Sequence, residues 1–150
     1  MSEIKNLLIG LEINADYSQM TYYGRRENDA ISVPVRAGTS EFIFPTSLCR
    51  LLKKDEWKFG TEAEYFITHR NGIEVRNPFE IWNGHESYKV LNVSMTPAEL
   101  LAVYVRAVLS HLGVNDVIKN IKGIAITTDS ISFEFAKNVR MAFVILGFSE

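Results

Sequence analysis

The sequence predicts an α/β fold in which a mixed sheet, with antiparallel strands early in the chain, carries helices packed on it. Three short apolar segments separated by turn residues fill the first 35 positions. A strongly amphipathic helix follows much later, and a strand with a second amphipathic helix ends the sequence. A helix, strand and helix in succession indicate a sheet with the apolar stripes of the helices packed on it. The 150 residues are enough for one domain with its own core, so a single domain over 1–150 is expected.

The first three strands are predicted as an antiparallel meander. Residues 7–13 are nearly continuous in apolar side chains, as in a strand buried on both faces. Residues 14–16 supply turn formers, and residues 17–23 alternate as a second, paired strand. Residues 31–35 alternate again and predict a third strand, in which Pro34 has no N–H to donate.

The middle of the chain, around residues 40–93, is predicted as an inserted irregular region of short strands and loops. Residues 57–60 are predicted to form one short strand, and residues 61–66 a helical turn or short helix. The aromatic residues that gather here favour core packing, with a partner groove as the alternative. They are Trp57, Phe59, Tyr65, Phe66, Phe79 and Trp82.

The clearest helix signal begins at Thr96. Thr96 at the cap, Pro97 at the first helical position and Glu99 three residues after the cap form a helix start. The apolar positions that follow, from Leu100 to Leu112, recur at helical spacing and form one stripe. Gly113 is predicted to end the helix.

The last part of the chain predicts a strand at residues 121–128 and a helix from about Ser132 to Leu146, ended by Gly147. Asp129 and Ser130 are expected to cap this helix. Its predicted apolar face consists of Phe135, Ala136, Val139, Ala142, Phe143 and Leu146. Three strands in a meander, then helix, strand and helix, is the element order of a ribonuclease-H-like unit.

The net charge argues against nucleic-acid binding and membrane anchoring, and the cysteine content favours a reducing compartment. The formal net charge of −2 gives no basic footprint for nucleic acid and no polybasic membrane anchor. No apolar run is long enough for a spanning helix, and the N-terminus lacks the basic start of a signal peptide. The single cysteine, Cys49, is expected to be a small buried side chain in a protein of the reducing cytoplasm.

Several segments resemble the DnaK-type heat-shock chaperone ATPases of the actin-like superfamily. IGLEINADYSQMTYY is similar to their first strand and phosphate loop, and FIFPTSLC to their Pro-Ser segment. KFGTEAE is similar to their Val-Gly-x-x-Ala step, and MTPAELLAVYVRAVLSHLG to their Thr-Pro-Glu-Glu helix. GIAITTDSISFEFAKNVRMAFVILGFS is similar to their Ile-Thr-Val-Pro strand with its helix. The matches fall in the same order and extend from about Leu8 to Phe148, which implies the N-terminal lobe of an actin-like ATPase fold.

The resemblance implies a phosphate-binding position at Glu12, Asn14, Ala15, Asp16 and Tyr17. In the family, the residue at the position of Glu12 is an Asp that acts through water on the metal. The alternative for Glu12 is a carboxylate at a strand end, solvated or bonded to nearby N–H groups. Asn14, Ala15 and Asp16 replace the family's Gly-Thr-Thr, so the loop loses permissive backbone and two hydroxyls. Asp16 would repel a triphosphate unless a metal intervened.

Other family elements are missing. The segment NPFEIWNG, which carries the family's catalytic Lys, has none here, and the nearest is Lys89. The second phosphate loop, the metal-contacting carboxylates and the adenosine pocket have no counterpart. No catalytic residue and no metal ligand are therefore predicted, and His69, His85 and His111 have no metal-ligand spacing.

Two functions follow as expectations. The first is the N-terminal lobe of a chaperone-like or actin-like nucleotide-binding protein, with ATP or ADP and Mg²⁺ bound only in a longer protein and no hydrolysis by this chain alone. The second is a non-catalytic scaffold or protein-interaction module descended from that fold. The expected partner is a second lobe, on the same longer polypeptide or on another protein. An open sheet edge is expected to favour self-association or disorder near the C-terminus.

Overall fold

The computed structural model describes residues 7–23, 28–35, 38–112 and 117–148. Its strands are β1 (Leu7–Ile13), β2 (Tyr17–Tyr23), β3 (Ala30–Ser32), β4 (Ile43–Pro45), β5 (Leu48–Leu51), β6 (Trp57–Phe59), β7 (Gly72–Glu74), β8 (Tyr88–Val90), β9 (Val93–Met95) and β10 (Ile121–Thr127). Its helices are α1 (Gly60–Thr68), α2 (Pro78–Trp82), α3 (Pro97–Ser110), α4 (Val117–Asn120) and α5 (Phe133–Leu146). The α/β class with a mixed sheet is therefore confirmed.

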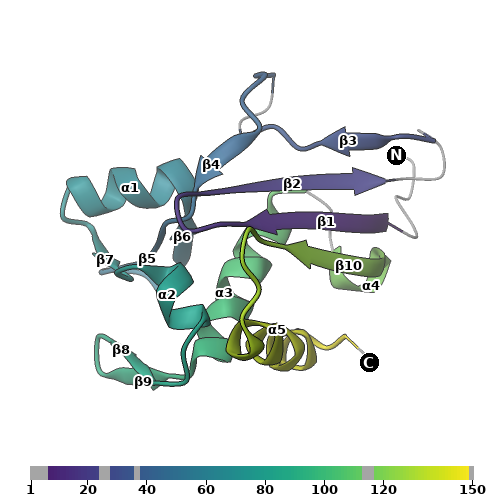
Figure 1. Cartoon of the computed structure of the whole chain (residues 1–150). Coiled ribbons are helices and arrows are strands. Elements are labelled where there is room, and N and C mark those ends of the chain that lie inside the picture. Colours follow the sequence, from purple (N-terminus) through teal and green to yellow (C-terminus); the bar gives the residue numbers. More distant parts are fainter. Residues whose placement is uncertain (1–6, 24–27, 36–37, 113–116, 149–150) are drawn as a thin grey trace.

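The main sheet has the order β10-β1-β2-β3, and β4 also pairs with β2. β1, β2 and β3 are antiparallel neighbours, as predicted. β10 is parallel to β1, although about a hundred residues separate them in the sequence. Figure 1 shows α3 and α5 together below this sheet. The alternate residues Leu7, Ile9, Leu11 and Ile13 of β1 are buried in the core that the two helices share.

β3 is shorter than the predicted strand. It ends at Ser32, because Pro34 has no N–H to continue a ladder. The N–H of Val33 still reaches the Met20 carbonyl at 2.9 Å, while that of Val35 bonds to Glu41. The chain thus turns away from the sheet at Pro34.

The middle region forms a second, three-stranded sheet of order β6-β5-β7, covered by α1. α1 confirms the short helix predicted after Trp57–Phe59. The hairpin β8–β9 stands apart from both sheets, at the lower left of Figure 1. One apolar core joins the two sheets, since Leu48 of β5 and Leu11 of β1 belong to the same buried cluster.

α3 confirms the predicted helix start and its apolar face. The Thr96 hydroxyl accepts from the Glu99 N–H at 3.2 Å, and the Glu99 carboxylate accepts from the Thr96 N–H at 2.8 Å. Leu101 and Val108 are completely buried. His111 forms the C-cap, and the predicted stop at Gly113 lies outside the described residues.

α5 differs from its prediction at two points. The cap is Ser132, whose hydroxyl accepts from the Phe135 N–H at 3.0 Å; the capping expected of Asp129 and Ser130 is wrong. Of the predicted face, Ala136 is exposed and Asn138 is buried instead. The stripe moves because the Asn138 amide donates to the carbonyls of Trp82 and Gly84, each at 2.9 Å, so its burial leaves no donor unpaired. Gly147 ends the helix with φ of 93°, as predicted.

Candidate functional site

The predicted phosphate-binding residues lie where the main sheet brings two parallel strands to the same edge. Glu12 and Thr127 are neighbours in the β1–β10 ladder, one residue before β1 ends and at the end of β10. Ligands of open α/β sheets commonly bind beyond the carboxyl ends of parallel strands. The turn of residues 14–16 and the loop after β10 form this edge.

The Glu12 carboxylate accepts hydrogen bonds from two neighbouring side chains of the site. Its Oε1 accepts from the Asn14 side-chain amide at 2.9 Å and from the Tyr17 hydroxyl at 3.0 Å. The hydrogen bond to Glu12 and its negative charge raise the pKa of Tyr17. Tyr17 therefore remains a neutral donor on the carboxylate.

Asn14 joins the two loops of the edge. Its side chain is buried, and its Oδ1 accepts from the Asp129 N–H at 2.8 Å. Its own N–H bonds to the Tyr17 carbonyl at 2.9 Å, closing the turn. Ala15 and Asp16 are exposed at the tip. The same hydrogen bond fixes the start of the loop that leads from β10 to the Ser132 cap of α5.

The turn of residues 14–16 lacks one feature that is common in phosphate-wrapping loops. A loop that wraps phosphate uses free backbone N–H groups and residues of positive φ. The described non-glycine residues with positive φ are Asn28, Arg70, Asn77 and Leu91, all outside residues 12–17. The Asn14 N–H is already bonded, and Asp16 and Asp129 place exposed carboxylates at the edge. Polyphosphate would be repelled there without a compensating cation.

Metal-binding groups of three or more His, Cys, Asp or Glu are absent from the part of the chain that the structure describes. His69 bonds through Nδ1 to the Tyr65 carbonyl, and His111 through Nε2 to the Pro34 carbonyl. One buried polar atom at the edge lacks a protein partner, the Thr128 hydroxyl. A buried hydroxyl of this kind is a natural position for an ordered water.

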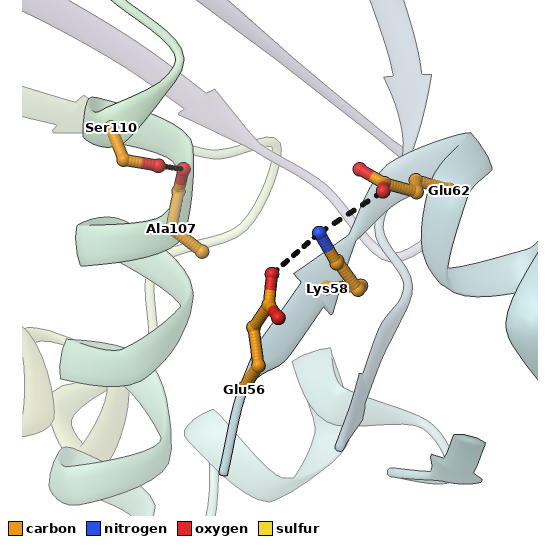
Figure 2. A network of polar contacts seen from close by, with 5 residues as sticks. All are labelled: Glu56, Lys58, Glu62, Ala107 and Ser110. Atoms are coloured by element: carbon orange, nitrogen blue, oxygen red, sulfur yellow. Dashed lines mark hydrogen bonds and ion pairs between the residues drawn. The ribbon is translucent and has the colours of Figure 1, made fainter. Parts of the chain in front are cut away.

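The segment NPFEIWNG, which resembles the lysine-bearing segment of the chaperone ATPases, contains no lysine. The segment NPFEIWNG forms α2 and the turn after it, and Lys89 is exposed on β8. Lys58 of β6 is held between two carboxylates, Glu56 at 2.7 Å and Glu62 at 3.1 Å, as Figure 2 shows. The hydrogen bond that the Lys58 ammonium donates to Glu56 is the main cause that raises the Lys58 pKa, so this ammonium is held in a structural ion pair.

Cys49 is fully buried, as expected, and burial raises its thiol pKa to about 11. Most of the middle aromatics pack inward. Trp82 is completely buried against Tyr104, with ring centroids 4.8 Å apart, and Phe59 stacks edge-on with Phe44 at 5.2 Å. Tyr65 is the exception, at 57% exposed.

Sequence reasoning missed a buried chain of hydroxyls. The Tyr104 hydroxyl donates to Ser18 at 2.8 Å, and Ser18 lies 2.8 Å from the Thr46 hydroxyl. Ser18 and Tyr104 are completely buried, so two consecutive hydrogen bonds join α3, β2 and the turn before β5. The only signal was a serine on the inward face of β2 beside Met20.

None of the helices in the described part of the chain has both the length and the apolar character needed to cross a bilayer. Comparison with curated proteins gave no match. One family model, described as "Family of unknown function (DUF5716) C-terminal", matches residues 29–150. The match leaves out β1, β2 and the turn between them, but it includes the loop after β10. Since it covers well over half of the sequence, the chain belongs to the DUF5716 C-terminal family.

Proposed function

We propose that the chain is a ribonuclease-H-like lobe of the actin-like kind, whose nucleotide edge is closed by its own side chains and which acts as a scaffold or protein-interaction module. The sheet order β3-β2-β1-β10, with only β10 parallel to β1, supports this descent. In a ribonuclease-H-like unit the three strands of the meander are followed by a parallel fourth strand on the side of the first.

The observation that carries the proposal is the occupied carboxylate of Glu12. In the heat-shock chaperone ATPases that the sequence resembles, the corresponding carboxylate acts on the metal through a bound water. Here the Asn14 amide and the Tyr17 hydroxyl occupy Glu12 Oε1, and Asn14 also holds the loop of Asp129. Mg²⁺-ATP at this edge would compete with these bonds for Glu12 Oε1, while Asp16 and Asp129 oppose the incoming negative charge.

Nucleotide binding is the second candidate function. It is favoured by the meeting of two parallel strand ends with carboxylates at Glu12 and Asp129, the place where such sheets bind ligands. In that case ATP or ADP with Mg²⁺ would bind between this lobe and a second one, on the same longer protein or on a partner. A cytoplasmic setting fits both candidates, because the one cysteine is buried as a free thiol.

Calorimetry and thermal shift with ATP and ADP, each with Mg²⁺, separate the two candidates. We expect no saturable heat, no shift of the unfolding midpoint and no measurable turnover with this chain. A parallel titration of Asp16→Asn tests whether charge alone prevents binding, since Asp16 is exposed and its side chain is outside the Glu12 cluster. Micromolar binding by the unaltered chain, or a nucleotide that contacts the backbone of residues 13–17, would establish the second candidate instead.

A further inference from the structure

We propose that the pocket between the two sheets binds a small, uncharged, planar aromatic molecule. The pocket has a volume of about 420 Å³, which is in the range of small-molecule sites. It is bordered by β4 of the main sheet, β6 of the small sheet, α1 and the end of α3. Its lining includes Val35, Phe44, Phe59, Gly60, Tyr65 and His111. None of the lining residues belongs to the edge at Glu12, so this proposal does not depend on the proposed function.

Four side chains with rings line this pocket and favour an aromatic ligand. The Phe59 ring makes edge-to-face contacts with Phe44, at a centroid distance of 5.2 Å, and with His111, at 5.9 Å. Tyr65 is 57% exposed, so its ring has surface left for a ligand. Pairs of aromatic rings gain free energy beyond the area that they bury. An aromatic ring should therefore bind here more tightly than a saturated ring of the same size.

Gly60, at the start of α1, leaves space in the pocket. Its φ is 62°, a conformation that is costly for a residue with a side chain. A Cβ added at Gly60 would lie 3.4 Å from the Phe44 side chain. Any larger side chain at this position would therefore take up volume beside the Phe44 ring that glycine leaves to a ligand.

The charged groups at the pocket already have partners within the protein. The Glu62 carboxylate, which lines the pocket, lies 3.1 Å from the Lys58 ammonium, as Figure 2 shows. His111 donates from Nε2 to the Pro34 carbonyl at 3.1 Å. An anionic ligand would be repelled by Glu62, and a cationic one would compete with Lys58 for that carboxylate, so an uncharged ligand is the better complement. The Thr61 hydroxyl also lines the pocket, has no hydrogen-bond partner among the described residues, and can bond a hydroxyl or carbonyl of the ligand.

Four soluble ring compounds test the proposal on the whole chain. Phenol and cyclohexanol compare an aromatic ring with a saturated one, and benzoate and benzylammonium add a charge of either sign. Amide NMR titrations should show saturable binding of phenol, of about millimolar affinity for so small a ligand, with shifts at Gly60, Thr61 and Tyr65. Phenol should bind about threefold more tightly than cyclohexanol, as expected for an added aromatic pair, and more tightly than both charged compounds.

Substitutions of the exposed Tyr65 separate the effect of its ring from that of its size. Tyr65→Phe should keep the affinity for phenol. Tyr65→Leu should weaken phenol binding by about threefold and leave cyclohexanol binding nearly unchanged. Phe133→Leu is the matched control, because Phe133 is 80% exposed and lies outside the pocket; it should alter neither affinity.

Equal binding of phenol and cyclohexanol would overturn the proposal, as would tightest binding of benzoate or benzylammonium. Shifts that map outside the pocket, or the absence of saturable binding by all four compounds, would overturn it as well. The titrations with ATP and ADP report on the edge at Glu12, so the outcome of either experiment leaves the other proposal standing.

Discussion

At the scale of single residues, the buried thiol of Cys49 gives a direct test of the packing between β5 and α1. Burial raises its pKa to about 11, so at about pH 8 roughly one molecule in a thousand carries the reactive thiolate. We expect alkylation of the native chain to be slower than that of the urea-unfolded chain by at least two orders of magnitude. Mass spectrometry of the labelled fraction over time measures both rates, and rapid labelling of the native chain would contradict the burial.

The side-chain hydrogen bonds at the edge of the sheet mark the limit of residue-level prediction. The resemblance of the run IGLEINADYSQMTYY to the first strand and phosphate loop of the chaperone ATPases pointed to Glu12 and its turn. It did not predict that Asn14 bonds to Asp129, since 115 positions separate them. That contact exists only because β1 and β10 pair in parallel.

At the scale of elements, the start of α5 provides a paired prediction. Ser132→Ala removes the hydroxyl that accepts from the Phe135 N–H and donates to Asn83 at 2.6 Å. The free energy of unfolding should fall by about 0.5–2 kcal/mol, the usual cost of losing an N-cap. Ser130→Ala is the control and should change it by much less. Urea denaturation measures the free energy of unfolding of both variants. A larger loss for Ser130→Ala than for Ser132→Ala would place the cap at Ser130, as expected from the sequence.

The apolar stripe of α3 gives a second prediction at this scale. Leu101→Ala and Val108→Ala each delete methyl groups from completely buried side chains. Each should lower the free energy of unfolding by about 1–4 kcal/mol. Val144→Ala on α5, where the side chain is 59% exposed, should cost much less. Unfolding midpoints that stay within error for both α3 variants would mean that this face is not core.

Prediction succeeded for elements whose signals are local. The capping box of α3 and the glycine stop of α5 at Gly147 are sequence patterns only a few residues long. Both helices were therefore predicted. The face of α5 was partly misjudged, because Asn138 is buried through carbonyls of the α2 turn that the periodicity does not include. The small sheet β6-β5-β7 was not predicted as a unit, since its strands of three or four residues carry too little periodicity.

At the scale of the whole molecule, the polar bonds and the core connect the two sheets. Tyr104 of α3 bonds to Ser18 of the main sheet, and Ser18 contacts Thr46 just before the small sheet. Asn138 likewise ties α5 to the turn after α2. Together with the shared apolar cluster, these contacts couple the two sheets, beside a small separate cluster of Cys49, Leu51 and Ala63 between β5 and α1. The two sheets should therefore unfold in one cooperative step.

Two optical probes test that cooperativity. Tryptophan fluorescence reports Trp57 of β6 and Trp82 of α2, whereas far-ultraviolet circular dichroism is dominated by the long helices α3 and α5. In urea the two transitions should share one midpoint. Tyr104→Phe should move both midpoints together, because it removes a buried donor that serves both sheets. If fluorescence changes at lower urea than circular dichroism, and Tyr104→Phe widens that gap, the middle region folds as a separate unit on the main sheet.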